Sequence, residues 1–154
     1  MTSQPKAKRV FAVSSGGGHW IQLKRILPSF EGHRLWIVGV HPGAVEGIQC
    51  EGFFQIKDAS MWSKGQLLMT SLRVLWLMLR HRPDVVVSTG AAPGFFALMF
   101  GKLVGARTIW IDSIANAGEL SLSGQKAGRF ADLWLTQWPD LAREGGPHYK
   151  GSVL

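Results

Sequence analysis

The run Ser14-Ser15-Gly16-Gly17-Gly18-His19 places three consecutive glycines between a short apolar stretch and a helical one. Glycine lets backbone amides turn toward a ligand, and the first turn of the following helix carries partial positive charge. This combination predicts a phosphate or diphosphate site, and a tight turn without a ligand is the structural alternative. The predicted contacts are Ser15, Gly16, Gly17 and Gly18. His19 can act as a general base, bind a phosphate or cap the helix.

Two better-known phosphate motifs do not fit this sequence. The dinucleotide fingerprint needs a third glycine where this chain has Ile21. A P-loop needs Ser or Thr after its lysine, and Lys126 is followed by Ala127. The second predicted strand also ends without an acidic residue, which counts against a further possible function, a stand-alone nucleotide-binding oxidoreductase.

Two further loops are rich in small and polar residues. One runs from Ser88 to Gly94, and the other begins at Asp112. The candidate ligand contacts in these loops are Thr89, Gly90, Pro93, Gly94, Ser113 and Asn116. A carboxylate after a strand can act as a base or accept a hydroxyl proton, so Asp112 is a second candidate base. Asp is also a common turn former and helix cap.

Short apolar runs alternate with helical stretches along the chain. The predicted strands are 9–14, 34–40, 53–56, 84–88, 107–112 and 133–136, and the predicted helices are 20–27, 44–51, 65–80, 94–104 and 125–130. This alternation favours an α/β fold, a Rossmann-like doubly wound parallel sheet. We expect a flexible basic N-terminus over residues 1–8 and one domain over 9–154. Because ligands bind beyond the carboxyl ends of parallel strands, all three loops should meet at one site.

Size and composition exclude several classes of protein. The chain has 154 residues, too few for a full two-domain enzyme. Its only cysteine, Cys50, cannot form an internal disulfide, and the five histidines show no metal-ligand spacing, so we expect no protein-bound metal. The longest uncharged run, Val85–Gly101, is interrupted by polar residues and by Pro93-Gly94, so it should not span a membrane. These features predict a cytosolic protein or one on a membrane surface.

The stretch 65–80 is mostly Leu, Val, Met and Trp and has one narrow polar stripe. Its charges are basic, and no acidic residue occurs from 59 to 83. Such a helix can lie in a membrane interface and attract anionic lipids, and a core helix flanked by solvated bases is the alternative. The predicted membrane contacts are Trp62, Arg73, Trp76 and Arg80. The net charge of +7 could also suit nucleic acid, but the bases are dispersed and no nucleic-acid-binding pattern is present.

In order, the three loops resemble those of the small subunit of two-component UDP-sugar glycosyltransferases. This family includes the membrane-anchoring subunit of the eukaryotic N-acetylglucosaminyldiphosphodolichol transferase and bacterial relatives that make capsule and exopolysaccharide. The most specific match runs from Phe130 to Leu141 and includes Gln137-Trp138, and the resemblance extends from about Arg9 to Gly151. The glycine loop is also similar to that of the N-acetylglucosaminyltransferase that forms lipid II.

The resemblance implies the N-terminal, acceptor-side half of a GT-B enzyme that is split over two chains. A separate partner would bind most of the UDP-sugar, and this chain would be inactive without it. The glycine loop and His19 would face the diphosphate of a polyprenyl-linked acceptor, and Gly90, Pro93 and Gly94 would line the cleft. Asp112 stands where relatives usually carry Glu, and Asn116 where many carry Arg.

The reaction implied by the resemblance inverts the anomeric centre. It needs no tightly bound cofactor, with the UDP-sugar as co-substrate, and it takes place at the inner, cytoplasmic face of the membrane. The sequence does not decide whether His19 or Asp112 is the general base. A non-catalytic module that recruits a partner transferase to the membrane is the alternative function.

Overall fold

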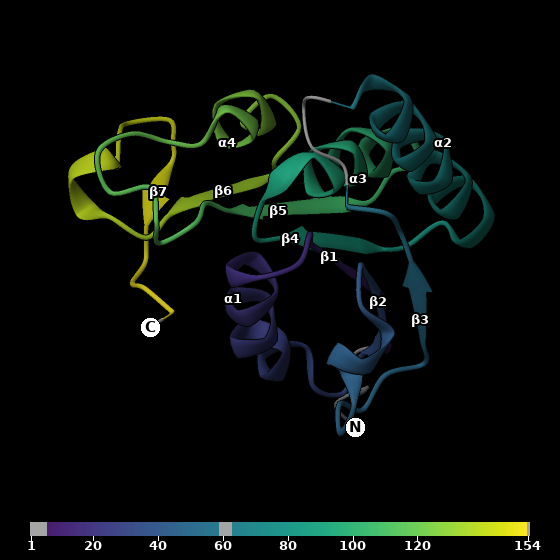
Figure 1. Ribbon diagram of the computed structural model, residues 1–154. Helices are drawn as coiled ribbons and strands as arrows, with labels where there is room; N and C mark the ends of the chain where they lie inside the picture. Colours follow the sequence, from purple (N-terminus) through teal and green to yellow (C-terminus); the bar gives the residue numbers. More distant parts are fainter. Residues whose placement is uncertain (1–5, 59–62, 154) are drawn as a thin grey trace, which may run out of the picture.

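The computed structural model describes residues 6–58 and 63–153. Its centre is a seven-stranded sheet with the order β3-β2-β1-β4-β5-β6-β7, and every neighbouring pair is parallel (Figure 1). The strands are β1 (Arg9–Val13), β2 (Arg34–Gly39), β3 (Gly52–Gln55), β4 (Val85–Ser88), β5 (Arg107–Ile111), β6 (Leu133–Thr136) and β7 (His148–Tyr149). The strand order reverses between β1 and β4, which confirms the predicted doubly wound, Rossmann-like fold.

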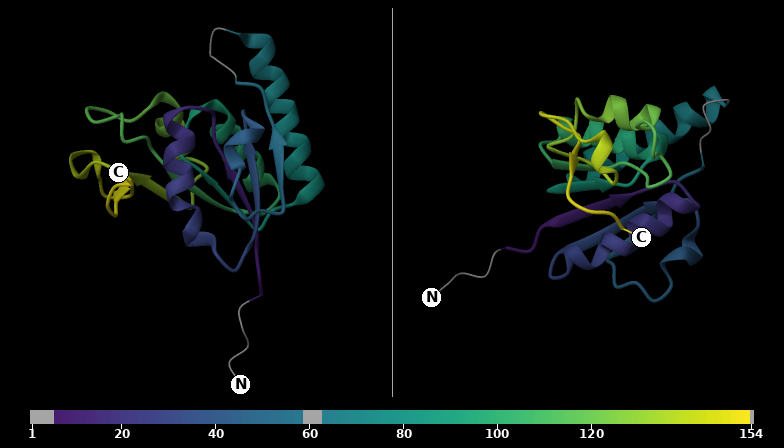
Figure 2. Two further views of the ribbon diagram at one scale, coloured as in Figure 1. Left: turned by 60° about the horizontal axis from the view of Figure 1, so that its bottom comes forward. Right: turned by 90° about the vertical axis from the view of Figure 1, so that its left-hand side faces the viewer.

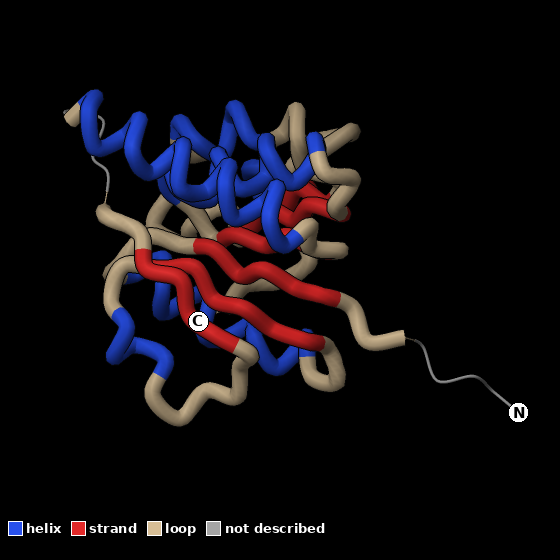
Figure 3. Tube along the Cα trace, turned by 90° about the vertical axis from the view of Figure 1, so that its right-hand side faces the viewer, coloured by secondary structure: helices blue, strands red, loops and turns tan. Residues whose placement is uncertain are grey.

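Helices cover both faces of the sheet. On one face lies α1 (Gly18–Ile26), and on the other lie α2 (Lys64–His81), α3 (Ala91–Leu103) and α4 (Leu122–Ala127) (Figures 2 and 3). Short 3-10 turns are η1 (Leu27–Phe30), η2 (Pro42–Val45) and η3 (Pro139–Leu141). Over the two described ranges, no helix has the length and apolar character needed to cross a bilayer.

The central strand β1 is buried on both faces. Phe11 and Val13 belong to the cluster under α2 and α3, whereas Val10 and Ala12 belong to the cluster under α1. Residues alternate between the two faces of a strand, so a strand in the middle of a two-sided sheet needs an apolar residue at every position. This explains why 10–13 reads as a continuous apolar run.

Helix α3 packs unusually close to the sheet because two of its residues are glycines. A methyl group on Gly101 would lie 2.9 Å from Val86, and one on Gly94 would lie 1.9 Å from the Ser88 hydroxyl and 3.3 Å from the Trp110 ring. These glycines therefore fix the height of α3 above β4 and β5. The consequence for the site is that the first turn of α3 is held directly beside the end of β4.

Three predicted helix boundaries were wrong. Only the start of 44–51 is helical, as the 3-10 turn η2, because Gly47 has a φ of +77° and ends any helix there. Helix α4 begins at Leu122 rather than at 125, because the Ser121 hydroxyl accepts a hydrogen bond from the Gly124 amide and caps it. Helix α3 begins three residues before the predicted 94, and the two-residue strand β7 was not predicted.

The amino ends of β1 and β4 are joined by an ion pair. The Asp84 carboxylate accepts hydrogen bonds from the Arg9 backbone amide at 2.7 Å and from the Arg9 guanidinium at 3.1 and 3.3 Å. The Asp84 amide in turn donates to the Arg9 carbonyl at 2.9 Å. Hydrogen bonds from the Arg9 side chain, and then from its backbone, hold the pKa of Asp84 below its ordinary value.

Asp84→Asn should lower the free energy of unfolding at pH 7 by about 1 kcal/mol, a modest value because the pair is two-fifths exposed. A lowered carboxyl pKa contributes stability above the unfolded value of about 4 and loses it as the pH falls below that value. The gap between wild type and variant should therefore narrow as the pH falls from 5 to 3 in urea unfolding. Glu51→Gln, in the exposed pair with Arg34, is the control and should change little. An Asp84→Asn gap that is unchanged at pH 3 would contradict the assignment.

Candidate functional site

The site lies where the strand order reverses. After β1 the chain enters α1 on one face, and after β4 it enters α3 on the opposite face, so the two connecting loops diverge from neighbouring strands (Figure 1). This divergence leaves a crevice at the carboxyl edge of the sheet, the usual ligand position in doubly wound folds. The predicted glycine loop and the predicted second loop therefore face each other.

His19 and Thr89 bind each other across this crevice. The Thr89 hydroxyl donates to the His19 carbonyl at 2.6 Å, and His19 Nδ1 lies 3.1 Å from the Thr89 carbonyl. A carbonyl only accepts, so Nδ1 must carry the proton. In the neutral ring this leaves a lone pair on Nε2, and His19 is only partly buried. The geometry thus presents an imidazole that is fixed in one tautomer and able to take a proton.

The residue after Thr89 makes room for this ring. Gly90 has a φ of +142° and a ψ of −178°, a region that essentially only glycine occupies. A methyl group on Gly90 would lie 2.4 Å from His19 Nδ1. The next residue, Ala91, has a φ of +63°, a conformation that costs free energy for a residue other than glycine. Strain of this kind is characteristic of functional turns, and here it positions His19.

The glycine loop opens toward solvent beside this pair. Ser15 is buried, whereas Gly17, with a φ of +64°, and Gly18 are exposed. In the part of the chain that the structure describes, no side chain caps α1 or α3, and neither helix has an acidic residue in its first turn. Both helices therefore direct partial positive charge into the crevice without a carboxylate to neutralise it. A cleft of about 30 Å³ adjoins the loop, lined among others by Ser15, Gly16 and His41.

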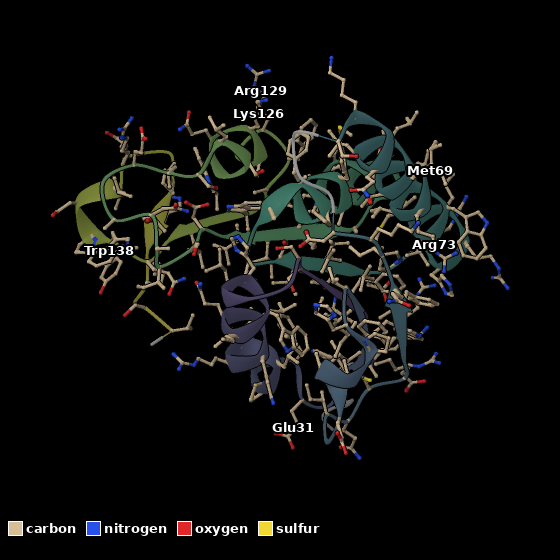
Figure 4. The ribbon with its side chains drawn as sticks, in the orientation of Figure 1. Glu31, Met69, Arg73, Lys126, Arg129 and Trp138 are labelled. Carbon is tan, nitrogen blue, oxygen red and sulfur yellow. The ribbon has the colours of Figure 1, made fainter. Side chains whose placement is uncertain are left out.

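A larger cavity of about 520 Å³ lies elsewhere. It is lined by residues at the end of α1 and the start of β2, among them Lys24, Glu31 and His33. Figure 4 shows Glu31 at the lower edge of the molecule. This cavity is at the amino ends of the strands, away from the three loops. It is less suited to an anion than the crevice because Glu31 and Glu51 line it.

Asp112 has a different environment from His19. It is 1% exposed, and its carboxylate accepts four hydrogen bonds: from Trp110 Nε1 (3.1 Å), Asn116 Nδ2 (3.2 Å), the Ser121 amide (2.9 Å) and the Ser121 hydroxyl (2.6 Å). Through Ser121 it also supports the cap of α4. Both oxygens are thus occupied in holding the loop 112–121 closed, and Asn116 takes part in that closure.

The other predicted contacts fall into two groups. Thr89 and Gly90 lie at the crevice with the glycine loop. Pro93 and Gly94 are buried within α3. Gly94 packs against Ser88, so the structure gives it a role in packing the helix onto the sheet. Ser113 is also buried and accepts a hydrogen bond from Gln22.

Three residues in this region were not among the predicted site residues. Gln22 and Gln137 are 5% and 3% exposed and bond each other, and Trp138 Nε1 donates to the Ile114 carbonyl at 2.8 Å. A signal for Gln22 was available, since it is a polar residue on the apolar stripe of α1 beside Leu23 and Ile26. Such a buried amide needs a hydrogen-bond partner. The pattern of one helix does not show which residue from a distant part of the chain supplies it.

Helix α2 exposes an apolar stripe on the outside of the molecule. Leu68, Met69, Leu72, Trp76 and Leu79 are each at least half exposed. The Arg73 guanidinium lies 5.2 Å from the centre of the Trp76 ring, and Arg80 is exposed one turn further on. Figure 4 shows Met69 and Arg73 projecting outward from α2. Trp62, the fourth predicted membrane contact, lies outside the described residues.

Gly90→Ala should displace the His19 ring and lower the free energy of unfolding by more than about 2 kcal/mol, because the methyl group adds a clash to the backbone strain. Gly32→Ala is the matched control, since Gly32 has a φ of +83° but open space around it, and it should cost only about 1 kcal/mol. The measurements are urea unfolding and the imidazole NMR signals of His19. Equal losses for both variants with unmoved His19 signals would refute this account of the turn.

Known proteins resemble this chain in sequence and in fold. The UDP-N-acetylglucosamine transferase subunit ALG14 of Yarrowia lipolytica is 38% identical over 74 residues, which cover 44% of this chain and 34% of the relative. The corresponding subunit of Schizosaccharomyces pombe is 32% identical over 88 residues, covering 54% of this chain and 40% of the relative. The chain therefore spans less than half the length of the curated relatives it matches.

Among solved structures, MurG of Acinetobacter baumannii superposes with a TM-score of 0.74 at 12% identity. The match covers 96% of this chain and 46% of MurG, and at this identity it shows a shared fold. The family model described as "Oligosaccharide biosynthesis protein Alg14 like" matches residues 53–153, well over half of the chain. The chain therefore belongs to the Alg14-like family of oligosaccharide biosynthesis proteins.

Proposed function

We propose that this chain is the acceptor-side subunit of an inverting UDP-sugar glycosyltransferase. It would bind a polyprenyl-diphosphate-linked sugar at a membrane surface and work with a separate donor-binding subunit. Family membership and the names of the relatives, which are UDP-N-acetylglucosamine transferase subunits, support this proposal. The observation that supports it most is the His19–Thr89 pair, which holds an imidazole with its Nδ1 protonated beside the exposed glycine loop.

The diphosphate of the acceptor would bind at the glycine loop. Exposed Gly17 and Gly18 allow close approach of the backbone, and two helix N-termini without carboxylates direct partial positive charge there. The amides and helix ends would offset part of the phosphate charge, and we propose that no protein-bound metal takes part. The UDP-sugar would enter as a co-substrate, held mainly by the partner.

His19 would act as the general base. Nε2 would take the proton from the acceptor hydroxyl while that oxygen attacks the anomeric carbon of the sugar. The new bond forms as the bond from the anomeric carbon to the UDP oxygen breaks, and this single displacement inverts the centre. The Thr89 carbonyl, which accepts from Nδ1–H, would stabilise the imidazolium that results.

Asp112 fits a positioning role better than the role of base. A base needs an oxygen that is free to reach the acceptor hydroxyl, and both Asp112 oxygens already accept hydrogen bonds within the loop. Its burial also separates it from the exposed glycine loop. Asp112 would therefore shape the wall of the site, leaving His19 as the base in this chain.

The face covered by α2, α3 and α4 would lie on the membrane. None of these three helices contains Asp or Glu, whereas they carry Lys64, Arg73, Arg80 and Lys126, besides Lys102, which is paired with Asp132. Figure 4 shows Lys126 and Arg129 at the top of the molecule, Arg73 at its right-hand flank and Glu31 at the bottom. An apolar stripe between bases suits an interface with anionic lipids, as at the inner face of a cell membrane. Peripheral attachment there is the localisation we propose.

The same surface favours the alternative function. A module that only recruits a partner transferase to lipid would also need the α2 stripe, but it would need no base at His19. The two functions therefore differ in their dependence on the imidazole.

His19→Ala should lower transfer from UDP-N-acetylglucosamine to a polyprenyl-diphosphate-linked sugar by about 10²–10⁴-fold when the chain is co-expressed with its partner, because the base is lost. His33→Ala, which lies directly before β2 at the amino edge of the sheet, is the control and should retain activity. Asp112→Asn should mainly lower thermal stability. If His19→Ala still binds the partner and transfers sugar at the wild-type rate, the chain is the recruitment module.

Arg73→Glu/Arg80→Glu should weaken flotation with liposomes that contain phosphatidylglycerol by tenfold or more, given about 1 kcal/mol per basic residue at an anionic surface. Lys24→Glu/Arg25→Glu makes the same change of charge on α1, on the other face of the sheet, and should have little effect. Equal losses for the two double variants would mean that net charge, and not the α2 surface, governs binding.

A further inference from the structure

The first turns of α1 contain a buried amide whose hydrogen-bonding capacity is fully used. Gln22 Nε2 donates to the Gly18 carbonyl at 3.3 Å and to the Ser113 hydroxyl at 3.1 Å. Gln22 Oε1 accepts from the Ile114 amide at 3.0 Å and from Gln137 Nε2. One side chain thus joins the glycine loop, the loop after β5 and the end of β6.

Backbone groups fix the orientation of both glutamines. The Ile114 amide can only donate, so the Gln22 atom facing it must be oxygen, and the Gly18 carbonyl can only accept, so the atom facing it must be nitrogen. Gln137 is fixed in the same way, because its Nε2 faces the Asp112 carbonyl at 2.9 Å and its Oε1 faces the Val153 amide at 2.9 Å. If either amide group were rotated by 180°, its NH₂ would face a backbone N–H and its oxygen would face a backbone carbonyl.

The result is a directed series of amides. The Val153 amide donates to Gln137, Gln137 donates to Gln22, and Gln22 donates to the Gly18 carbonyl. Each amide in such a series polarises the next, so the loss of one bond weakens the others. The Val153 carbonyl is also held, by Arg25 Nη1 at 3.0 Å, so residues near Val153 are docked beside α1 (Figure 2).

We propose that Gln22 is a positioning residue for the phosphate site and that Gln137 couples it to the docking of the C-terminal segment, residues 150–153. Gly18 begins α1 and belongs to the loop that faces the anion, and Ser113 belongs to the loop after β5. By holding both, Gln22 fixes the position of Gly18 relative to the loop after β5. Undocking of Val153 would leave Gln137 Oε1 without a donor and would loosen Gly18 through Gln22.

This inference rests on the proposed function, because it assigns the residues that set the geometry of the same phosphate site. The probe is geranyl diphosphate, a soluble prenyl diphosphate, and the measurement is its dissociation constant for the purified chain. Gln22→Met, which keeps the length of the side chain but has no donor or acceptor, should raise that constant about five- to tenfold. Thr70→Val is the control for stability, since Thr70 is buried and its one hydrogen bond, to the Lys57 carbonyl, involves none of the three loops.

A second pair of variants tests the coupling. Val153→Pro removes the amide that donates to Gln137, and Val153→Ala keeps it while losing side-chain contact. Val153→Pro should weaken binding of geranyl diphosphate several-fold, and Val153→Ala should not. In the Gln22→Met background, Val153→Pro should have little further effect, because the series is already broken.

The outcomes separate the two proposals. If wild type does not bind geranyl diphosphate, the phosphate site and with it the proposed function are wrong. If wild type binds and Gln22→Met binds equally well, or no worse than Thr70→Val, Gln22 is only structural and this inference alone fails. Equal binding by Val153→Pro and Val153→Ala would overturn the coupling to the C-terminal segment.

Discussion

The reciprocal hydrogen bonds between His19 and Thr89 hold together the two loops on which the site depends. The strand order reverses between β1 and β4, so the following helices run to opposite faces and their loops diverge. A crevice of this kind has no ladder of backbone bonds to hold its walls. Here one side chain from each loop bonds the backbone of the other. The Thr89 carbonyl accepts a hydrogen bond from His19 Nδ1, and the Thr89 hydroxyl donates one to the His19 carbonyl. The same pair of bonds therefore fixes both the separation of the loops and the tautomer of His19.

This contact requires close packing behind it. Gly90 must lack a side chain for the His19 ring to fit, and Gly94 must lack one for α3 to lie against Ser88 and Trp110. The strained φ of Ala91 persists because the sheet and α3 hold both ends of the turn. Deeper in the molecule, neutral amides rather than ion pairs join the loops. Gln22 and Gln137 can be buried at little cost because each of their polar atoms has a partner.

The sequence was sufficient for features that local patterns determine. Continuous apolar runs predicted six of the seven strands, and the glycine loop, Thr89 and Gly90 were placed correctly beside one another because parallel strands share one carboxyl edge. The prediction of a helix over 44–51 was wrong because Gly47 adopts a positive φ, which the composition of the segment does not reveal. The surroundings of Asp112 and the pairing of Gln22 with Gln137 depend on contacts between residues far apart in the chain, so no pattern in one segment could show them.

The placement of α2 also relates the proposed membrane face to the site. Because α2 follows β3 in a parallel sheet, its first turn lies at the carboxyl edge and its last turn at the amino edge. The exposed stripe begins at Leu68 and Met69, in the half of α2 nearer the three loops, and continues to Leu79. A surface that contacts this stripe therefore passes beside the edge at which the glycine loop opens. On the proposed function, a lipid-linked diphosphate can reach that loop while its polyprenyl chain remains in the bilayer, so the fold that creates the crevice also determines the direction from which the acceptor arrives.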